Sequence, residues 1–197
     1  MIGASLLGYL IGSLPLGFLA GRRLAGVDLR RVGSGNVGAT NMYRVSGLRL
    51  GLAVMTIDLV KGAAAVLVAA RVGAADLEVV TAGVAAVAGH VYPVWLKGRG
   101  GKGVATACGA FAVLAPAATV AAAAAFALTV WATGIVSLGS VAASVTLPIV
   151  AGFTPASPAV AIGAAVTAAL VIWRHRGNLS RLREGTERSI VRGGRDA

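Results

Sequence analysis

The sequence predicts an all-α polytopic membrane protein with about seven transmembrane helices, its N-terminus outside and its C-terminus in the cytoplasm. Of the 197 residues, 57% are hydrophobic and only 13% are charged. An ordinary soluble domain carries about 25% charged residues, so this chain has too little polar surface for a water-soluble globule. The long segment from Val104 to Ile172 contains no Lys, Arg, Asp or Glu. The single cysteine, Cys108, also excludes a scaffold held by disulfides.

Apolar stretches of the length that a bilayer requires follow one another along the chain. A spanning helix needs about 20 mostly apolar residues, and the first stretch meets this condition because no charge precedes Arg22. Further on, the breakers Ala115-Pro116, Thr133-Gly134 and Gly152 to Pro158 separate successive helices. The expected spans, all within one domain of residues 1–197, are about 2–20, 48–70, 77–96, 104–115, 117–133, 139–152 and 158–173. Several of them are short, so we expect tilt or burial behind neighbouring helices.

The basic residues gather on one predicted side of the membrane. Of the 18 Lys and Arg residues, 16 fall in the segments 21–49, 97–103, 134–138 and 174–197. Only Lys61, within a span, and Arg71, in an outside loop, lie elsewhere. Because cytoplasmic loops of membrane proteins are enriched in Lys and Arg, this split places those segments inside. The net charge of +11 therefore reflects topology, and we expect no nucleic-acid partner.

The first polar cluster runs Gly33-Ser34-Gly35-Asn36-Val37-Gly38-Ala39-Thr40-Asn41 and is followed by Arg44. It matches G-x-G-x-x-G, but no predicted strand precedes it, so a dinucleotide-binding unit is not indicated. Glycine lets a backbone approach a ligand, successive N–H groups form an anion nest, and Ser, Thr and Asn add donors. Arg44 can supply a bidentate charge to a phosphate. We interpret the cluster as a phosphate site, with a flexible cytoplasmic loop as the alternative.

Three more clusters fall on the same predicted side. Residues 97–103 place Lys97, Arg99 and Lys102 among glycines and predict an anion clamp, although a basic loop that touches only lipid headgroups would also explain the charges. Near the C-terminus, His175 and Asn178 are three residues apart and share a face if their helix continues. The segment 136–140, Val-Ser-Leu-Gly-Ser, is predicted to be a small polar turn between two helices.

Two charged residues lie within a predicted span. Asp58 and Lys61 are spaced i, i+3 on one helix. Charges inside a membrane are costly unless they are paired. We therefore interpret them as a buried pair that neutralises itself and has a structural role.

With these clusters in view, the chain resembles the bacterial acyl-phosphate:glycerol-3-phosphate acyltransferase (PlsY) family. The resemblance covers nearly the whole chain. The first motif resembles S-G-N-x-G-A-T-N-x-x-R, from Ser34 to Arg44, and the second resembles G-H-x-x-P followed by K-G-G-K-G-x-A-T, with Arg99 in the usual Lys place. The third resembles R-H-x-x-N-I-x-R-L-x-x-G-T-E, from Arg174 to Glu187, with Leu179 for Ile.

The resemblance implies a seven-helix enzyme of the bacterial inner membrane with its active site on the cytoplasmic side. It implies transfer of a fatty acyl group from acyl phosphate to the 1-hydroxyl of glycerol 3-phosphate, giving lysophosphatidic acid and phosphate, the first step of phospholipid synthesis. By motif position it assigns catalytic roles to Ser34, Arg44, Lys102, His175 and Asn178. It assigns substrate binding to Gly35, Asn36, Gly38, Thr40, Asn41, Gly101, Gly103 and Ser140.

The residue types in the polar clusters are suited to this reaction. An acyl phosphate is already activated, so it needs positioning and charge stabilisation more than a protein nucleophile. The clusters contain no Cys and no G-x-S-x-G elbow, which favours direct attack over an acyl-enzyme. Either His175 or the acceptor's own phosphate can serve as base. We expect no metal and no cofactor, and the partners are the two substrates and membrane lipids, with no protein partner identified.

Other function classes would use the same anion clusters. The main alternative is a membrane transporter of organic phosphates, which should show sites near the bilayer midplane or broken repeats. A CDP-alcohol phosphotransferase would need a metal-binding set of Asp residues, and this chain has only three Asp besides Asp196. A lipid-binding scaffold would show no turnover.

Overall fold

The computed structural model describes residues 2–190, and these residues are helical with no strand, which confirms the all-α class. Arg192 and Arg195, which the charge count includes, lie outside the described residues. The chain forms two compact units, Met1–Leu114 and Ala115–Ala197.

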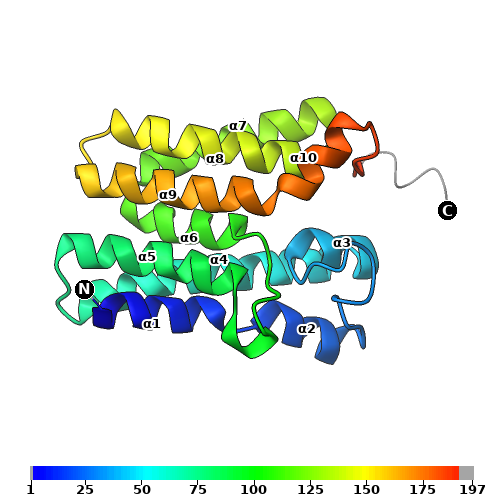
Figure 1. Ribbon diagram of the computed structural model, residues 1–197, viewed down its shortest axis with the longest axis horizontal. Helices are drawn as coiled ribbons and strands as arrows, with labels where there is room; N and C mark the ends of the chain where they lie inside the picture. The colour runs from blue at the N-terminus through cyan, green and yellow to red at the C-terminus, as the bar shows by residue number, and fades with distance from the viewer. Residues whose placement is uncertain (1, 191–197) are drawn as a thin grey trace. The chain divides into compact units, whose positions relative to one another are not determined.

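The first unit is built around a long central helix. Its elements are α1 (Ile2–Ser13), α2 (Leu16–Leu24), α3 (Ala39–Ser46), α4 (Leu48–Arg71), α5 (Asp76–Val91), the 3-10 turn η1 (Val94–Leu96) and α6 (Val104–Leu114). Helix α4 contacts α1, α3, α5 and α6, and α1 packs along α5 (Figure 1). The α1–α5 pair is very close, because a Cβ at Gly8 or Gly12 would overlap the backbone of Ala82 or Ala86. Small residues that let helix backbones approach are typical of membrane helix packing.

The first apolar stretch is not one continuous helix. The first expected span, residues 2–20, lies within the candidate span Ile2–Leu24, but the helix breaks between Ser13 and Leu16. Pro15 has no backbone N–H and disfavours helical geometry in the residue before it, which explains the break. Pro93 has the same effect on α5, which ends at Val91 before the short turn η1.

The second unit contains α7 (Pro116–Thr133), α8 (Val136–Gly152), α9 (Pro158–Arg174) and α10 (Arg176–Arg183). Helix α8 packs against both α7 and α9 (Figure 1). The breaker residues do separate these helices, and Gly134 ends α7 with a φ of 70°. Glycine adopts this left-handed conformation without the strain that a Cβ would bring.

Two sequence predictions in this unit are wrong. Residues 136–140 are not a turn but the first residues of α8, because Gly134 and Ile135 alone make the connection. His175 and Asn178 do not lie on one continuing helix either. The chain bends by 54° between α9 and α10, and His175 is the residue that precedes α10, with its carbonyl accepting the Asn178 N–H at 2.8 Å.

Four helical segments among the described residues are long and apolar enough to cross a membrane, or five if α9 and α10 count as one bent span. They are Ile2–Leu24, Leu48–Arg71, Asp76–Leu96 and Pro116–Thr133. Helices α6 and α8 are apolar but shorter. The seven spans, the single domain and the orientation of the termini therefore stay predictions.

Candidate active site

Asn41 organises the first glycine-rich loop. Its side chain is only 2% exposed. The Nδ2 group donates to the carbonyls of Leu29, Val32 and Asn36 at 2.9–3.1 Å, and Oδ1 accepts the Ser34 N–H at 2.8 Å. The amide contacts four backbone groups of the loop. These contacts indicate that Asn41 holds the loop in shape, and its role in substrate binding stays a prediction.

Several backbone N–H groups of this loop donate hydrogen bonds to acceptors close to them in the chain. Besides the Ser34 N–H, the Gly35 N–H donates to Val32 O at 3.1 Å and the Gly38 N–H donates to Asn36 Oδ1 at 2.8 Å. Each of these three N–H groups thus has an acceptor within this part of the chain, and the anion nest stays a prediction.

Side chains suited to binding an anion lie on α3, at Thr40 and Arg44, and before it, at Ser34. Ser34 is an exposed residue, and Thr40 and Arg44 are half-buried. Thr40 and Arg44 are spaced i, i+4 on α3, so they share one face of that helix. Nearby, Arg30 forms an ion pair in which its Nη2 lies 2.8 Å from Asp28 Oδ2. The Arg30 hydrogen bonds lower the pKa of Asp28 to about 2.

The second glycine-rich loop is held against the end of α5. The Gly101 N–H donates to His90 O at 3.1 Å and the Gly100 N–H donates to Val91 O at 3.2 Å. Both glycines are buried. A Cβ at Gly101 would overlap the His90 ring, so only glycine fits there. This packing carries Lys102, a half-buried residue, on a backbone whose course is set by α5.

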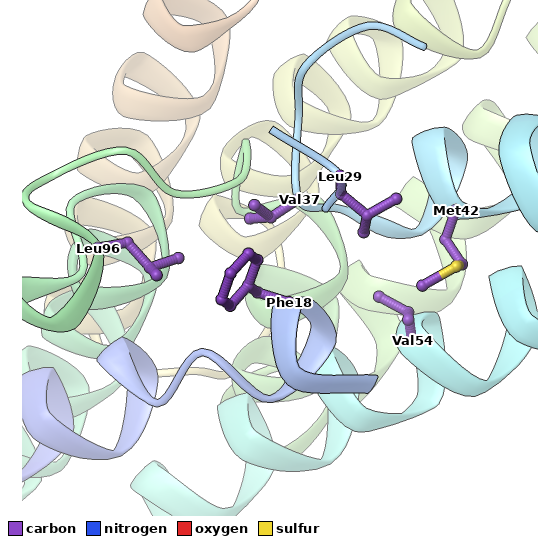
Figure 2. Close-up of a cluster of buried hydrophobic side chains, with 6 residues drawn as sticks. All are labelled: Phe18, Leu29, Val37, Met42, Val54 and Leu96. Atoms are coloured by element: carbon purple, nitrogen blue, oxygen red, sulfur yellow. The ribbon is translucent and has the colours of Figure 1, made fainter. Parts of the chain in front are cut away.

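One apolar core supports both loops of the first unit. It contains Phe18, Leu29, Val37, Met42, Val54 and Leu96. In Figure 2, Phe18 of α2 points toward Val37, with Leu96 on one side and Leu29, Met42 and Val54 on the other. Val37 belongs to the first loop and Leu96 directly precedes the second. The structure thus brings together the loop that carries Ser34 and leads into α3, with Arg44, and the loop that carries Lys102.

The first unit also contains a buried charged cluster, which lines the same small cavity as Val37 and Leu96. Lys61 Nζ is 2.9 Å from Asp58 Oδ1, which confirms the predicted pair. His90 Nδ1 lies 3.4 Å from the same oxygen, which the sequence did not indicate. Asp58 and His90 are far apart in the chain, and no local pattern links them.

In the second unit, Glu187 is a hub that joins three side chains; it ends the third motif, which assigns it no role. Its Oε1 accepts hydrogen bonds from Ser137 Oγ at 2.8 Å and Asn178 Nδ2 at 2.6 Å, and its Oε2 accepts from Arg181 Nε at 2.8 Å. Burial alone would raise the pKa of Glu187, but these hydrogen bonds outweigh it and keep the pKa below the ordinary value.

His175 is fixed in a defined orientation. It is 2% exposed, and its Nδ1 lies 2.8 Å from the carbonyl of Val171. A carbonyl can only accept, so Nδ1 carries the proton in this contact. In the neutral ring Nε2 is then the basic nitrogen, which keeps His175 suitable as a base.

Ser140 and Asn178 are both buried residues of this unit. Ser140 Oγ donates to Val136 O at 2.9 Å, which leaves its oxygen lone pairs as acceptors. Asn178 is oriented by Glu187. In the second unit, Ser140 lies on α8, His175 lies between α9 and α10, and Asn178 lies on α10.

Known proteins are similar to this chain along nearly its whole length. Residues 2–185 match the family model described as glycerol-3-phosphate acyltransferase. The glycerol-3-phosphate acyltransferase of Myxococcus xanthus (strain DK1622) is 48% identical over 184 residues, covering 93% of this chain and 96% of the relative. That of Synechococcus sp. (strain CC9902) is 46% identical, covering 93% and 92%.

Solved structures give the same result. The crystal structure of PlsY (YgiH), an integral membrane glycerol 3-phosphate acyltransferase, in its glycerol 3-phosphate form is similar with a TM-score of 0.90 and 35% identity, covering 96% of this chain and 94% of that chain. Its lysophosphatidic acid form gives a TM-score of 0.88 and 34% identity, covering 95% and 94%. The chain is thus an all-α, multi-pass membrane protein that belongs to the glycerol-3-phosphate acyltransferase family.

Proposed function

We propose that this protein transfers a fatty acyl group from acyl phosphate to the 1-hydroxyl of glycerol 3-phosphate. The observation that carries the proposal is the match of residues 2–185 to glycerol-3-phosphate acyltransferases, together with solved relatives in glycerol 3-phosphate and lysophosphatidic acid forms. The acyl donor is inferred from the chemistry of the residues. An acyl phosphate needs no protein nucleophile, and the described clusters contain cations, amides and hydroxyls in place of a Cys or a serine elbow.

In the proposed reaction, the 1-hydroxyl oxygen attacks the acyl carbonyl carbon and forms an ester bond. The bond between the carbonyl carbon and the phosphate oxygen breaks, and phosphate departs with the electron pair. The hydroxyl proton passes to His175 Nε2 or to the phosphate of the acceptor. The oriented, buried His175 ring supports the first route, and the second needs no protein group.

Roles for the other residues follow from their charge and placement. Arg44 and Lys102 would bind phosphate oxygens, since charge-assisted hydrogen bonds to phosphate are the strong ones. Ser34 and Thr40 would add hydroxyl donors. Ser140 and Asn178 would position substrate in the second unit. Gly35, Asn36, Gly38, Gly101 and Gly103 would act by shaping the two loops, as their internal hydrogen bonds and positive φ angles at Gly35 and Gly103 support.

We further propose that the enzyme lies in the bacterial inner membrane with both substrate loops facing the cytoplasm. The concentration of Arg and Lys in the segments 21–49, 97–103 and 174–197 supports this orientation. Glycerol 3-phosphate is charged and would then reach the loops from the aqueous side, whereas the acyl chain would stay in the bilayer.

The purified protein in detergent tests the proposal. We expect palmitoyl phosphate and glycerol 3-phosphate to give lysophosphatidic acid and phosphate in equal amounts, and palmitoyl-CoA to give no product. A Lys102→Ala variant should lose most of this turnover, whereas Thr81→Val, on α5 and paired with Ser5, should keep it. Phosphate release without lysophosphatidic acid, or equal use of palmitoyl-CoA, would refute the proposed acyl transfer.

A further inference from the structure

The buried cluster of Asp58, Lys61 and His90 has no part in the proposed chemistry. The three side chains are 5%, 5% and 7% exposed. Asp58 contacts both basic groups, and Lys61 Nζ also lies 3.4 Å from the carbonyl of Leu14, where α1 ends. The cluster lines a small cavity of about 10 Å³, the size of about one water molecule. Because this cavity is too small for a substrate, the three side chains can affect the reaction only through the residues that they contact.

His90 touches the loop that carries Lys102 in two ways. Its carbonyl accepts the Gly101 N–H at 3.1 Å. Its ring lies where a Cβ of Gly101 would be, with Nε2, Cε1 and Cδ2 all within 3.0 Å of that position. The next residue in the chain is Lys102. The His90 ring thus packs directly against the backbone of Gly101, the residue before Lys102.

The ring is held at its opposite edge by Asp58. Nδ1 faces Asp58 Oδ1 at 3.4 Å, while the edge containing Nε2 faces Gly101. A rotation of the ring would break the first contact and push Gly101 away. Lysine is a point charge on a flexible stem, so its reach depends on where its backbone is fixed. In an active site, a misplacement of about 1 Å can cost about 100-fold in rate.

We infer that His90, oriented by Asp58, is a positioning residue that sets the place of Lys102 in the active site. The inference rests on the proposed phosphate-binding role of Lys102. Phosphate binding by Lys102 thereby depends on the His90–Asp58 contact, which is buried between α4 and α5. A cluster that only stabilises the fold would instead affect all steps of the reaction without regard to Lys102.

A double-mutant cycle separates these two roles. His90→Asn keeps an N–H near Asp58 and removes the outer part of the ring beneath Gly101. We expect it to lower kcat/KM about tenfold in the wild-type background and less than about twofold in Lys102→Ala, because coupled residues are non-additive. Thr81→Val, on the same helix, should show no coupling to Lys102→Ala. An equal loss from His90→Asn in both backgrounds would overturn the inference.

A second pair of variants tests the contact itself. Gly101→Ala should be strongly impaired, since its methyl group overlaps the His90 ring. Adding His90→Asn vacates that space, so the double variant should recover at least about threefold in kcat/KM over Gly101→Ala alone. A double variant no better than Gly101→Ala would contradict the proposed contact.

A readout without turnover keeps this inference separate from the proposed function. Trypsin cleaves after Lys102, and the cleavage can be followed by mass spectrometry in detergent. We expect His90→Asn to be cut there faster than wild type, and Thr81→Val to be cut at the wild-type rate. An unchanged rate of cleavage after Lys102 in His90→Asn would contradict the positioning role of His90. A wild-type protein that makes no lysophosphatidic acid would instead refute the proposed function and leave the proteolysis result readable.

Discussion

Replacing Glu187 by Gln should destabilise the second unit in a pH-dependent way. The Glu187 side chain is 4% exposed and receives hydrogen bonds from Ser137 and Asn178 on one oxygen and from Arg181 on the other. A Gln amide must turn an NH₂ group toward one of these donors, so at least one contact is lost.

The size of the effect follows from the contacts. Charge-assisted hydrogen bonds contribute about 1.5–3 kcal/mol. The Arg181 side chain is 46% exposed, so its ion pair adds little to this range. For a chain of this size, 1 kcal/mol corresponds to about 2–4 °C in Tm, so Glu187→Gln should lower Tm by about 3–12 °C at neutral pH.

The pH dependence has a definite sign. The pKa of Glu187 is lowered in the folded protein, so its carboxylate stabilises the fold above the ordinary value of 4.5. That stabilisation is lost as the pH falls through the folded pKa. The Tm difference between wild type and Glu187→Gln should therefore be largest near neutral pH and shrink in acid.

Thermal unfolding in detergent, followed across pH, checks this expectation. Glu184→Gln is the matched control, because Glu184 is an exposed carboxylate on the same segment and accepts a hydrogen bond from the exposed Ser180. It should shift Tm far less. A Glu187→Gln protein whose Tm deficit is the same at acid and neutral pH would refute the hub assignment.

Four other outcomes are expected. In a Cys108→Ala background, a cysteine at Ala75 should react with an impermeant thiol reagent from outside the cell and one at Arg99 should not; labelling of Arg99 alone would reverse the orientation. EDTA should leave turnover intact because no cluster is rich in carboxylates, and a loss restored by Mg²⁺ would contradict the chemistry. Lys102→Ala should lower kcat/KM for a phosphate substrate at least about tenfold, measured by phosphate release, since charge-assisted contacts contribute about 1.5–3 kcal/mol. If His175 only positions substrate, His175→Gln should keep much of kcat with an unchanged pH profile, whereas a base role predicts loss of kcat and of an acid limb near pH ~6.5.

The sequence by itself determined the all-α class and most helix limits. These are local properties, because a bilayer requires long apolar helices whose backbone groups are satisfied within the segment. Pro116, Gly134 and Pro158 act on their own neighbours, so the limits of α7, α8 and α9 could be predicted within a few residues. The three motifs likewise predicted the segments that carry the candidate site residues.

Tertiary structure decided the hydrogen-bond partners of the candidate site residues. Asn41 looked like a ligand-binding amide, yet its polar atoms contact backbone groups up to 12 residues away. The His90–Asp58 contact and the Glu187 hub join residues 32 and 50 positions apart, respectively. Such partners are chosen by how helices pack, because a buried polar group must find whatever donor or acceptor the neighbouring helix presents. A motif records that a residue is present, whereas its hydrogen-bond partners arise only when distant segments are folded together.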